Sequence, residues 1–233
     1  MAGVSLTWLG HSTFRVDTPG GKRLYMDPWL SNPKCPEGER EPERVDVIAI
    51  THGHGDHIGE AVELGKKFSP KLIAIYELAA WLEGQGFPGA TELGMNKGGT
   101  VEAEGIKFSM THALHSSAML GDGPPVYLGD AAGYVVEFEN GTKVYFAGDT
   151  AAFTDMQIIG KHLAPDVAVL PIGDHYTMGP RQAAVALELL GVKRCVPCHY
   201  GTFPMLVGTP DELRKHAPDV EVISPEPGEA IAV

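Results

Sequence analysis

The stretch Thr51-His52-Gly53-His54-Gly55-Asp56-His57-Ile58-Gly59 contains three imidazoles and a carboxylate within six residues. These are side chains that bind zinc and related transition metals in proteins. The apolar run directly before it, residues 45–50, predicts a buried strand, so the cluster is expected where that strand ends. The three glycines let the chain curl, which allows side chains close in sequence to point to one centre.

Two other interpretations of this stretch are disfavoured by its spacing. A helical metalloprotease motif places its two histidines four residues apart on one helix face, whereas His52 and His54 are two apart. A solvated, tag-like histidine tract is of low complexity, but this stretch alternates in an ordered way after an apolar strand. The pattern therefore indicates a metal-binding loop.

The composition restricts the class of protein. A chain of 233 residues that is 43% hydrophobic can build the core of one large α/β domain or two small ones. No stretch approaches the ~20 apolar residues of a membrane span, and the N-terminus lacks the basic and apolar segments of a signal peptide. Three cysteines, an odd number, predict reduced thiols and a cytoplasmic protein.

The charge balance bears on the partners of the chain. Eighteen basic residues against thirty acidic ones give a formal net charge of −12, which disfavours nucleic-acid binding. We therefore expect a small-molecule substrate. The sequence leaves open whether the chain forms a homo-oligomer.

Two hairpins are predicted at corresponding places in the chain. Residues 13–18 and 22–26 read as one pair of strands, and residues 134–139 and 142–146 as another. The second pair is joined by Asn140-Gly141, a strong hairpin signal because both residues tolerate positive φ. Each hairpin leads to an aspartate, which suggests two halves of similar design within a single domain of residues 1–233. The seam between the halves is expected within residues 116–133.

Helices, tail strands and loops are predicted from local signals. Residues 179–190 have proline in the first turn and Gly191 as a stop, and residues 209–216 begin with a capping box. Further helices are expected at residues 59–67, 77–83 and 151–162, and strands at residues 220–223 and 230–233. Long irregular stretches at residues 28–44 and 116–133 are typical of functional lids or linkers.

The other candidate site residues share one position: each follows a strand-like run. These residues are His11, His115, Asp149, Asp174, His175 and His199. In open α/β sheets, ligands bind beyond the carboxyl ends of the strands. Polar side chains repeatedly placed there can converge on one pocket.

The loop motif His52-x-His54-x-Asp56-His57 resembles the His-x-His-x-Asp-His signature of the metallo-β-lactamase superfamily. The later motifs of that superfamily fit His115, the Gly-Asp-Thr turn around Asp149, and His199. Further motifs at residues 8–12, 27–29, 171–174, 176–180 and 197–204 resemble its small bacterial and archaeal metal-dependent hydrolases. That branch is similar to L-ascorbate-6-phosphate lactonase and, more distantly, to N-acyl-phosphatidylethanolamine phospholipase D.

The resemblance implies an α/β fold, an αββα sandwich in which two mixed sheets face each other, with helices on both outer faces. It also implies two divalent metal ions at one sheet edge, with zinc expected and manganese or iron as alternatives. The implied ligand sets are His52, His54 and His115 for one ion, and Asp56, His57 and His199 for the other, with Asp149 bridging. Two carboxylates and a bridging hydroxide leave such a pocket slightly positive, which favours an anionic substrate.

The expected function is metal-dependent hydrolysis. A metal-bound hydroxide would attack a lactone or ester carbonyl, or a phosphoryl centre, of a small molecule. Asp56 could orient the attacking water, and the proton donor could be His175, His11 or water. Asp27 is expected to orient a metal-binding histidine, as carboxylates behind a metal site commonly do.

Several alternatives remain beside these assignments. His112 competes with His115 as the strand-end ligand, and Asp149 could instead cap a helix starting near Ala151. The run Cys195-Val-Pro-Cys198-His199 fits patterns for haem attachment or a redox pair, although it reads as a strand and no signal peptide precedes it.

Three other functions are compatible with the same fold. A phosphodiesterase that processes nucleic acid is disfavoured by the acidic balance. The family's di-iron redox enzymes carry glutamate where His54 stands, and their flavin-binding partner domain is absent from this sequence. A non-catalytic metal-binding module would keep the ligands without turnover.

Overall fold

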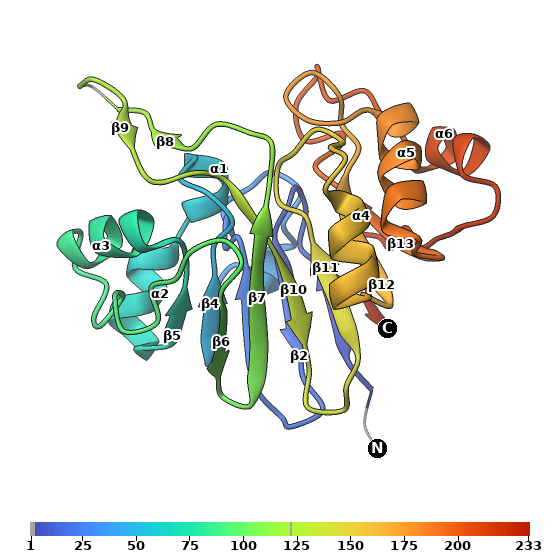
Figure 1. Cartoon of the computed structure of the whole chain (residues 1–233). Coiled ribbons are helices and arrows are strands. Elements are labelled where there is room, and N and C mark those ends of the chain that lie inside the picture. Colours follow the sequence, from blue (N-terminus) through green and yellow to red (C-terminus); the bar gives the residue numbers. More distant parts are fainter. Residues whose placement is uncertain (1–2, 122) are drawn as a thin grey trace.

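The computed structural model describes residues 3–121 and 123–233. Residues 1–2, part of the terminus expected to lack a signal peptide, and residue 122, in the expected 116–133 loop, lie outside that description. Two large sheets face each other, and helices lie outside them (Figure 1). Among the described residues, no helix is long and apolar enough to cross a membrane.

The first sheet has six strands in the order β15-β1-β2-β3-β4-β5. Their bounds are Ala230–Ala232, Ser5–Trp8, Phe14–Asp17, Arg23–Met26, Val47–Ala49 and Lys71–Ile73. The pairs from β15 to β3 are antiparallel, and β3, β4 and β5 are parallel.

The second sheet has seven strands in the order β14-β13-β12-β11-β10-β7-β6. Their bounds are Glu221–Val222, Arg194–Cys198, Val167–Pro171, Lys143–Phe146, Ala132–Glu137, Ile106–His112 and Thr100–Ala103. The pairs from β6 to β11 are antiparallel, and β11 to β14 are parallel. Both sheets are thus mixed, which confirms the expected αββα sandwich.

Strand β12 shows how one strand serves two cores. Val167 and Val169 belong to the core between the sheets, whereas Ala168 and Leu170 belong to the core beneath the helices. Successive side chains of a strand point to opposite faces, so a strand covered on both faces is apolar throughout. The rings of Phe14 and Phe146, one from each sheet, meet across the sandwich with centroids 5.9 Å apart.

The helices divide between the two outer faces. Helices α2 (Ala61–Phe68) and α3 (Tyr76–Gly84) pack beside the first sheet. Helices α4 (Met156–Ile158), α5 (Pro180–Leu190) and α6 (Pro210–His216) cover the second sheet, as Figure 1 shows. A single turn, α1 (Gly55–Ile58), lies at the upper end of the sandwich in that view.

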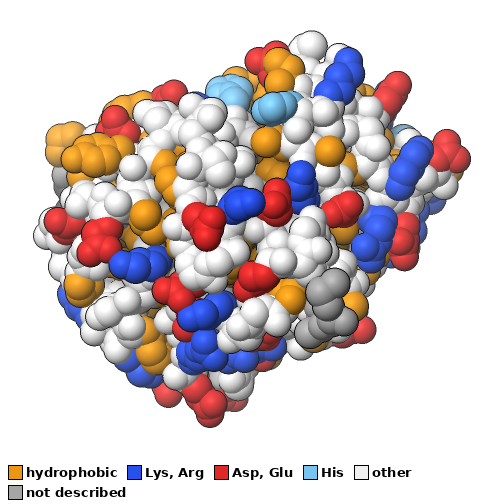
Figure 2. Space-filling model, turned by 60° about the horizontal axis from the view of Figure 1, so that its bottom comes forward, with side chains coloured by type: hydrophobic (Ala, Val, Ile, Leu, Met, Phe, Trp, Pro, Cys, Tyr) orange, Lys and Arg blue, Asp and Glu red, His pale blue; other side chains and the backbone are white. Residues whose placement is uncertain are grey.

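The hairpin turns of both sheets meet at the lower end of the molecule. Lys22 forms an ion pair with Glu104, and the Thr18 hydroxyl donates to Glu139 over 2.8 Å, so each contact links the two sheets. Figure 2 brings this end forward and shows acidic and basic side chains interspersed on it. Mixed charge of this kind does not resemble the continuous basic surface of a nucleic-acid-binding protein.

Both predicted hairpins are present, as β2–β3 and β10–β11. The turn of the second hairpin differs from the expected one, because φ is positive at Gly141 (85°) but not at Asn140. The turn is closed by the amide of Gly141, which donates to the carbonyl of Phe138 over 2.8 Å. One left-handed residue is therefore sufficient here.

The two late helices are present as predicted. Gly191 ends α5 in the left-handed conformation, and the Thr209 side chain accepts the amide of Glu212 at the start of α6. The helix expected from Ala151 begins only at Met156 and continues as a π-helical turn, Ile159–Leu163.

The crossing between the sheets lies earlier than the seam expected within residues 116–133. The chain leaves the first sheet after β5 and enters the second at β6, because β6 pairs with β7, which in turn pairs with β10. Residues 116–133 instead contain a small separate hairpin, β8 (Ala118–Met119) and β9 (Val126–Tyr127). The core between the sheets draws on both of them, and the single domain over residues 1–233 stays a prediction.

Gly160 provides a test of the helical layer. A Cβ at this position would lie 2.1 Å from the carbonyl oxygen of Leu190, so Gly160→Ala must push the π-helical turn away from α5. We expect a loss of about 2 kcal/mol in the free energy of unfolding. The control is Gly84→Ala in α3, where a Cβ meets nothing within 4 Å and little change is expected. Equal denaturant midpoints for the two variants would contradict this packing.

Candidate metal centre

Seven predicted ligands lie at one end of the sandwich because the strands before them run in the same direction. His52 follows β4, His115 follows β7, Asp149 follows β11 and His199 follows β13. The other three, His54, Asp56 and His57, belong to α1 and its N-cap. The carboxyl ends of strands from both sheets therefore supply one cluster of side chains. Residues far apart in the sequence converge there, as expected.

Close backbone packing holds the histidine loop in place. At Gly59, which ends α1, φ is 45°, and a Cβ there would lie 2.3 Å from the carbonyl oxygen of Pro28. At Gly148, φ is 63° and a Cβ would lie 2.8 Å from the Cβ of Thr51. Only glycine fits these two positions, so the loop and the Gly-Asp-Thr turn can approach each other closely.

One group of three imidazoles matches the first expected metal site. The ligand atoms of His52, His54 and His115 lie within 4.8 Å of one another. His52 Nε2 and His54 Nδ1 are 3.0 Å apart. Three imidazoles with room for a fourth ligand are a common catalytic zinc arrangement.

A second group surrounds the buried carboxylate of Asp149. Its Oδ2 lies 3.1 Å from His199 Nε2, 3.4 Å from His57 Nε2 and 3.6 Å from His115 Nε2. Two ligands of one tetrahedral zinc, each bonded at ~2.1 Å, are separated by roughly 3.4 Å. The spacing around Asp149 thus equals the spacing of donors that share an ion.

Buried atoms without hydrogen-bond partners also fit a metal. His57 Nε2 and Asp149 Oδ1 are buried and have no such partner. Leaving polar atoms of this kind unsatisfied is costly, and a cation would satisfy both. His57, Asp56, His199 and His11 form another group that could hold an ion. The donor set fits divalent metal, while its division into two sites stays a prediction.

Asp27 acts on this cluster through hydrogen bonds. Its Oδ1 accepts the backbone amide of Thr51 and its Oδ2 the Thr51 hydroxyl, both over 2.8 Å. The same Oδ2 lies 2.8 Å from His57 Nδ1. This contact leaves His57 Nε2 facing Asp149, so Asp27 orients a histidine that is predicted to bind metal.

His11, whose role was open between several alternatives, is a hydrogen-bond partner of Asp56. Its Nε2 lies 3.0 Å from Asp56 Oδ2, and its ring centroid lies 4.0 Å from that of His199. The carbonyl oxygen of His11 accepts the His199 amide and the Trp8 indole N–H, each over 2.9 Å. The N-terminal motif is thereby joined to the last metal-ligand motif.

The protonation states favour metal binding. Burial lowers the pKa of His52, His54 and His115, so their neutral, ligand-competent forms persist to lower pH than in water. Burial alone would also lower the pKa of His57, but Asp149 and Asp27 raise it well above its usual value. Without a cation, His57 therefore holds a proton in the place that a metal ion can take.

A cavity of about 510 Å³ opens over the cluster. Five of the predicted ligands line it, together with a group of apolar and aromatic residues. The ligands are His54, Asp56, His115, Asp149 and His199, and the aromatic residues are Tyr176 and Phe203. Tyr176 and Phe203 belong to two of the motifs that resemble the metal-dependent hydrolases, but the sequence does not predict that they line a cavity, because no local pattern shows which side chains enter one.

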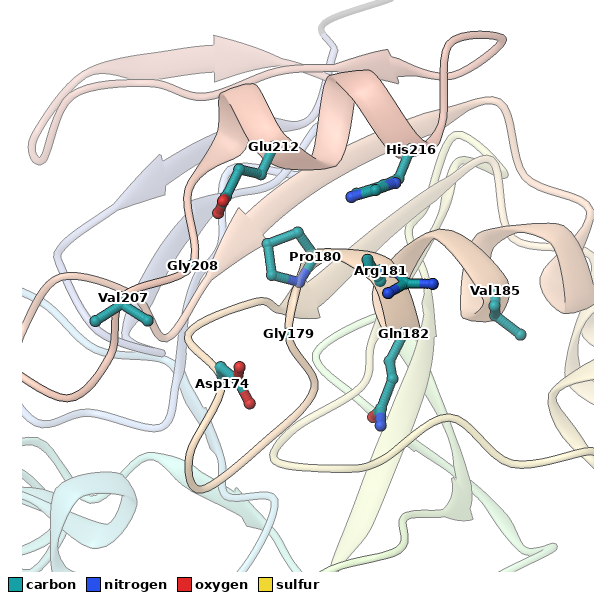
Figure 3. Close-up of a pocket in the computed structure, with 10 residues that line it drawn as sticks. All are labelled: Asp174, Gly179, Pro180, Arg181, Gln182, Val185, Val207, Gly208, Glu212 and His216. Carbon is teal, nitrogen blue, oxygen red and sulfur yellow. The ribbon is translucent and has the colours of Figure 1, made fainter.

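A larger cavity, about 720 Å³, lies between α5, α6 and the loops beside them (Figure 3). Asp174 lies at its edge in that view, and none of the seven predicted ligands lines it. His175 is exposed, and its amide donates to the Asp174 carboxylate over 2.8 Å. His175 is not among the residues that line the smaller cavity, so its role as a proton donor stays a prediction.

The remaining sequence alternatives can be placed in the structure. His112 is exposed at the end of β7, with its Nδ1 3.2 Å from Lys97 Nζ, and takes no part in the cluster. Asp155, not Asp149, occupies the N-cap position of the helix that begins at Met156. Cys195 and Cys198 are buried free thiols on β13.

Comparisons with known proteins agree with this geometry. Residues 22–200 match the family model of the beta-lactamase superfamily domain. The UPF0173 metal-dependent hydrolases of Koribacter versatilis and Chloroflexus aurantiacus are 51% and 46% identical to this chain. The first similarity covers 98% of both chains, and the second covers 98% of this chain and 97% of its relative.

A solved structure extends the agreement to three dimensions. Igni18, a metallo hydrolase from the hyperthermophilic archaeon Ignicoccus hospitalis, has a TM-score of 0.87 and 37% identity. The match covers 100% of this chain and 99% of the Igni18 chain. The superfamily indicated by the histidine loop is confirmed, while the closer resemblance to L-ascorbate-6-phosphate lactonase stays a prediction.

Removing the Asp27 carboxylate should weaken metal binding without removing a ligand. We expect Asp27→Asn to lower zinc affinity about 10–100-fold, measured by competition with a chromogenic chelator, because His57 loses its fixed orientation. The control is Asp46→Asn, which removes a carboxylate that accepts the Arg23 amide over 2.7 Å at the other end of β3. Equal affinities in the two variants would show that Asp27 does not position His57.

The cysteines should be unreactive in the folded protein. Burial raises the pKa of Cys35 to about 11 and that of Cys195 to about 12, and the pKa of Cys198 is also raised well above its usual value. Thiolate, the reactive form, is then roughly 0.1% or less of Cys35 and Cys195 at pH 8. We expect Ellman's reagent to modify thiols only after unfolding, and rapid modification of native protein would contradict this.

Proposed function

We propose that this chain, which belongs to the beta-lactamase superfamily and its UPF0173 metal-dependent hydrolases, hydrolyses a carbonyl or phosphoryl bond of a small molecule with two divalent ions. One observation supports this most strongly. Three histidine nitrogens from separate segments surround one buried carboxylate oxygen, Asp149 Oδ2, at 3.1–3.6 Å.

The ligand assignment follows the groups in the structure. His52, His54 and His115 would hold one ion, and Asp56, His57 and His199 the other, with Asp149 shared between them. Divalent ions held there would lower the pKa of water and polarise the electrophilic oxygen of the substrate. Zinc is proposed because the donors are mostly imidazoles, which also accept manganese or iron.

Asp56 is proposed to orient the attacking water. Burial would raise the pKa of its carboxyl group, but the hydrogen bond from His11 and the charge of His57 lower it, so the carboxylate is ionised at neutral pH. Asp56 also lines the cavity, where its free oxygen can accept a hydrogen bond from water. The leaving group would take its proton from His175, which is next to the cavity residue Tyr176, or from solvent.

The alternatives have less support. A redox role would resemble the di-iron members of the fold, but this chain has His54 where they carry glutamate. A non-catalytic module does not account for an open cavity directly over the ligands. A cytoplasmic location remains proposed, since the three cysteines are buried and free.

The proposal is tested by metal analysis together with a panel of lactone, phosphodiester and thioester substrates. Hydrolysis by metal-loaded protein, lost on chelation and restored by the ion, is the expected result. Bound iron without hydrolysis would favour the redox role, and full metal content without turnover would favour the binding module.

A variant pair isolates the ligand role of one residue. We expect His115→Ala to lose bound metal and to lower kcat/KM more than about 100-fold. That loss exceeds the roughly 10–100-fold effect typical of removing a residue that only orients a ligand. The matched control, His112→Ala, removes an exposed imidazole three positions earlier, and this variant should keep its metal content and its kcat/KM. Full metal content and turnover in His115→Ala would refute the assignment.

A further inference from the structure

We propose that the cavity over the metal cluster selects an uncharged substrate, an ester or lactone whose apolar substituent lies against a wall formed by Met119, Leu120, Tyr176 and Phe203. This inference rests on the proposed function for the reaction itself. We call these four residues the apolar wall. Together with Ala118 they line the same cavity as the predicted ligands.

The residues that line the cavity are of two kinds. Some are predicted ligands, with His54, Asp149 and His199 among them, and others form the apolar wall. A substrate whose scissile bond reaches Asp149 has apolar side chains available within the same cavity for its neighbouring substituent. A cavity of about 510 Å³ has the size of pockets that hold small organic ligands.

The apolar wall leaves a large amount of hydrophobic surface in contact with water. Leu120 is 70% exposed and Tyr176 is 54% exposed. Exposed apolar groups that gather at one hollow, rather than being scattered singly, are typical of a binding site. Covering them with a substrate's own apolar group would remove both surfaces from water, and that gain increases with the length of the group.

Phe203, one of the four residues of the apolar wall, is held in place by two other rings. The ring of Phe203 stacks on Trp29, with centroids 6.0 Å apart, and meets the ring of His11 edge-on at 5.6 Å. Phe203 is thus fixed next to the hydrogen-bond partner of Asp56. The apolar contact and the predicted catalytic carboxylate are held by the same group of side chains.

The charges around the cavity argue against an anionic substrate. Among the described residues that line it there is no lysine or arginine, and two lining residues, Asp56 and Asp149, are acidic. Phosphate recognition in proteins commonly uses such cations. The expectation of an anionic substrate rested on the net charge of the two ions, two carboxylates and a bridging hydroxide, and the lack of lysine and arginine among the described lining residues points instead to a neutral substrate.

The reaction is balanced without any further reactant. The oxygen of water forms a bond to the carbonyl carbon, the bond from that carbon to the ester oxygen breaks, and the departing oxygen takes a proton. The products are a carboxylic acid and an alcohol, joined in one molecule when the substrate is a lactone.

The test compares chain lengths on zinc-loaded protein. We expect kcat/KM for p-nitrophenyl acetate, butanoate, hexanoate and octanoate to rise by about two- to fourfold per added methylene until the cavity is filled. Glucono-δ-lactone 6-phosphate should be hydrolysed less efficiently than glucono-δ-lactone. A flat dependence on chain length, or a preference for the phosphorylated lactone, would overturn the inference.

Two variants assign the effect to the wall. In Met119→Ala/Leu120→Ala the ratio of kcat/KM for octanoate to that for acetate should fall at least about fivefold, because the chain loses its apolar contact. The matched control is Val126→Ala/Tyr127→Ala on β9, the partner strand of the same hairpin. These residues are exposed and do not line the cavity, so the ratio should not change.

A binding measurement separates this inference from the proposed reaction. Calorimetric titration of zinc-loaded protein with the uncharged ligands ethanol, 1-hexanol and 1-octanol should show affinity rising with chain length, and the wall variant should lose that rise. If no ester is hydrolysed but affinity rises with chain length, the proposed reaction is refuted and the apolar site is supported. If esters are hydrolysed but affinity does not depend on chain length, the apolar site is refuted and the proposed reaction is supported.

Discussion

The buried carboxylate of Asp149 lies at the centre of the histidine cluster at the upper end of this sandwich. An unpaired charge in such a place would be very costly, so it needs cationic or hydrogen-bonding partners. Three histidine nitrogens approach the same oxygen, Asp149 Oδ2, from α1, from the end of β7 and from the end of β13. The cluster thus links both halves of the chain, and a divalent ion can replace the proton that His57 otherwise holds.

The rest of the fold can be understood as support for that cluster. At His11, Asp27 and His199 the backbone has positive φ (51°, 46° and 53°), a conformation that is unfavourable for residues other than glycine. Such strain persists where surrounding structure enforces it, commonly at functional sites. Here the strained residues are held by hydrogen bonds at the site itself: the Asp27 carboxylate accepts the amide and the hydroxyl of Thr51, and the carbonyl oxygen of His11 accepts the amide of His199.

The features that could be predicted from the sequence depend on local pattern or on the direction of strands. The hairpins, α5 and α6 have local signals, and residues after parallel strands converge because those strands end at one edge. The crossing between the sheets was missed because it depends on the pairing of β7 with β10, a non-local choice. The hydrogen bond between His11 and Asp56 spans 45 positions, and the inward direction of Tyr176 and Phe203 depends on loop conformation. None of these leaves a periodic trace in the sequence.

The central claim is that distant residues meet around divalent ions, and anomalous diffraction tests it most directly. Crystals of protein incubated with zinc, measured on both sides of the zinc absorption edge, should show one peak among His52, His54 and His115. A second peak is expected beside Asp149, within bonding distance of His57 and His199. Zinc bound only elsewhere, or no peak at either position with zinc in excess, would contradict the account.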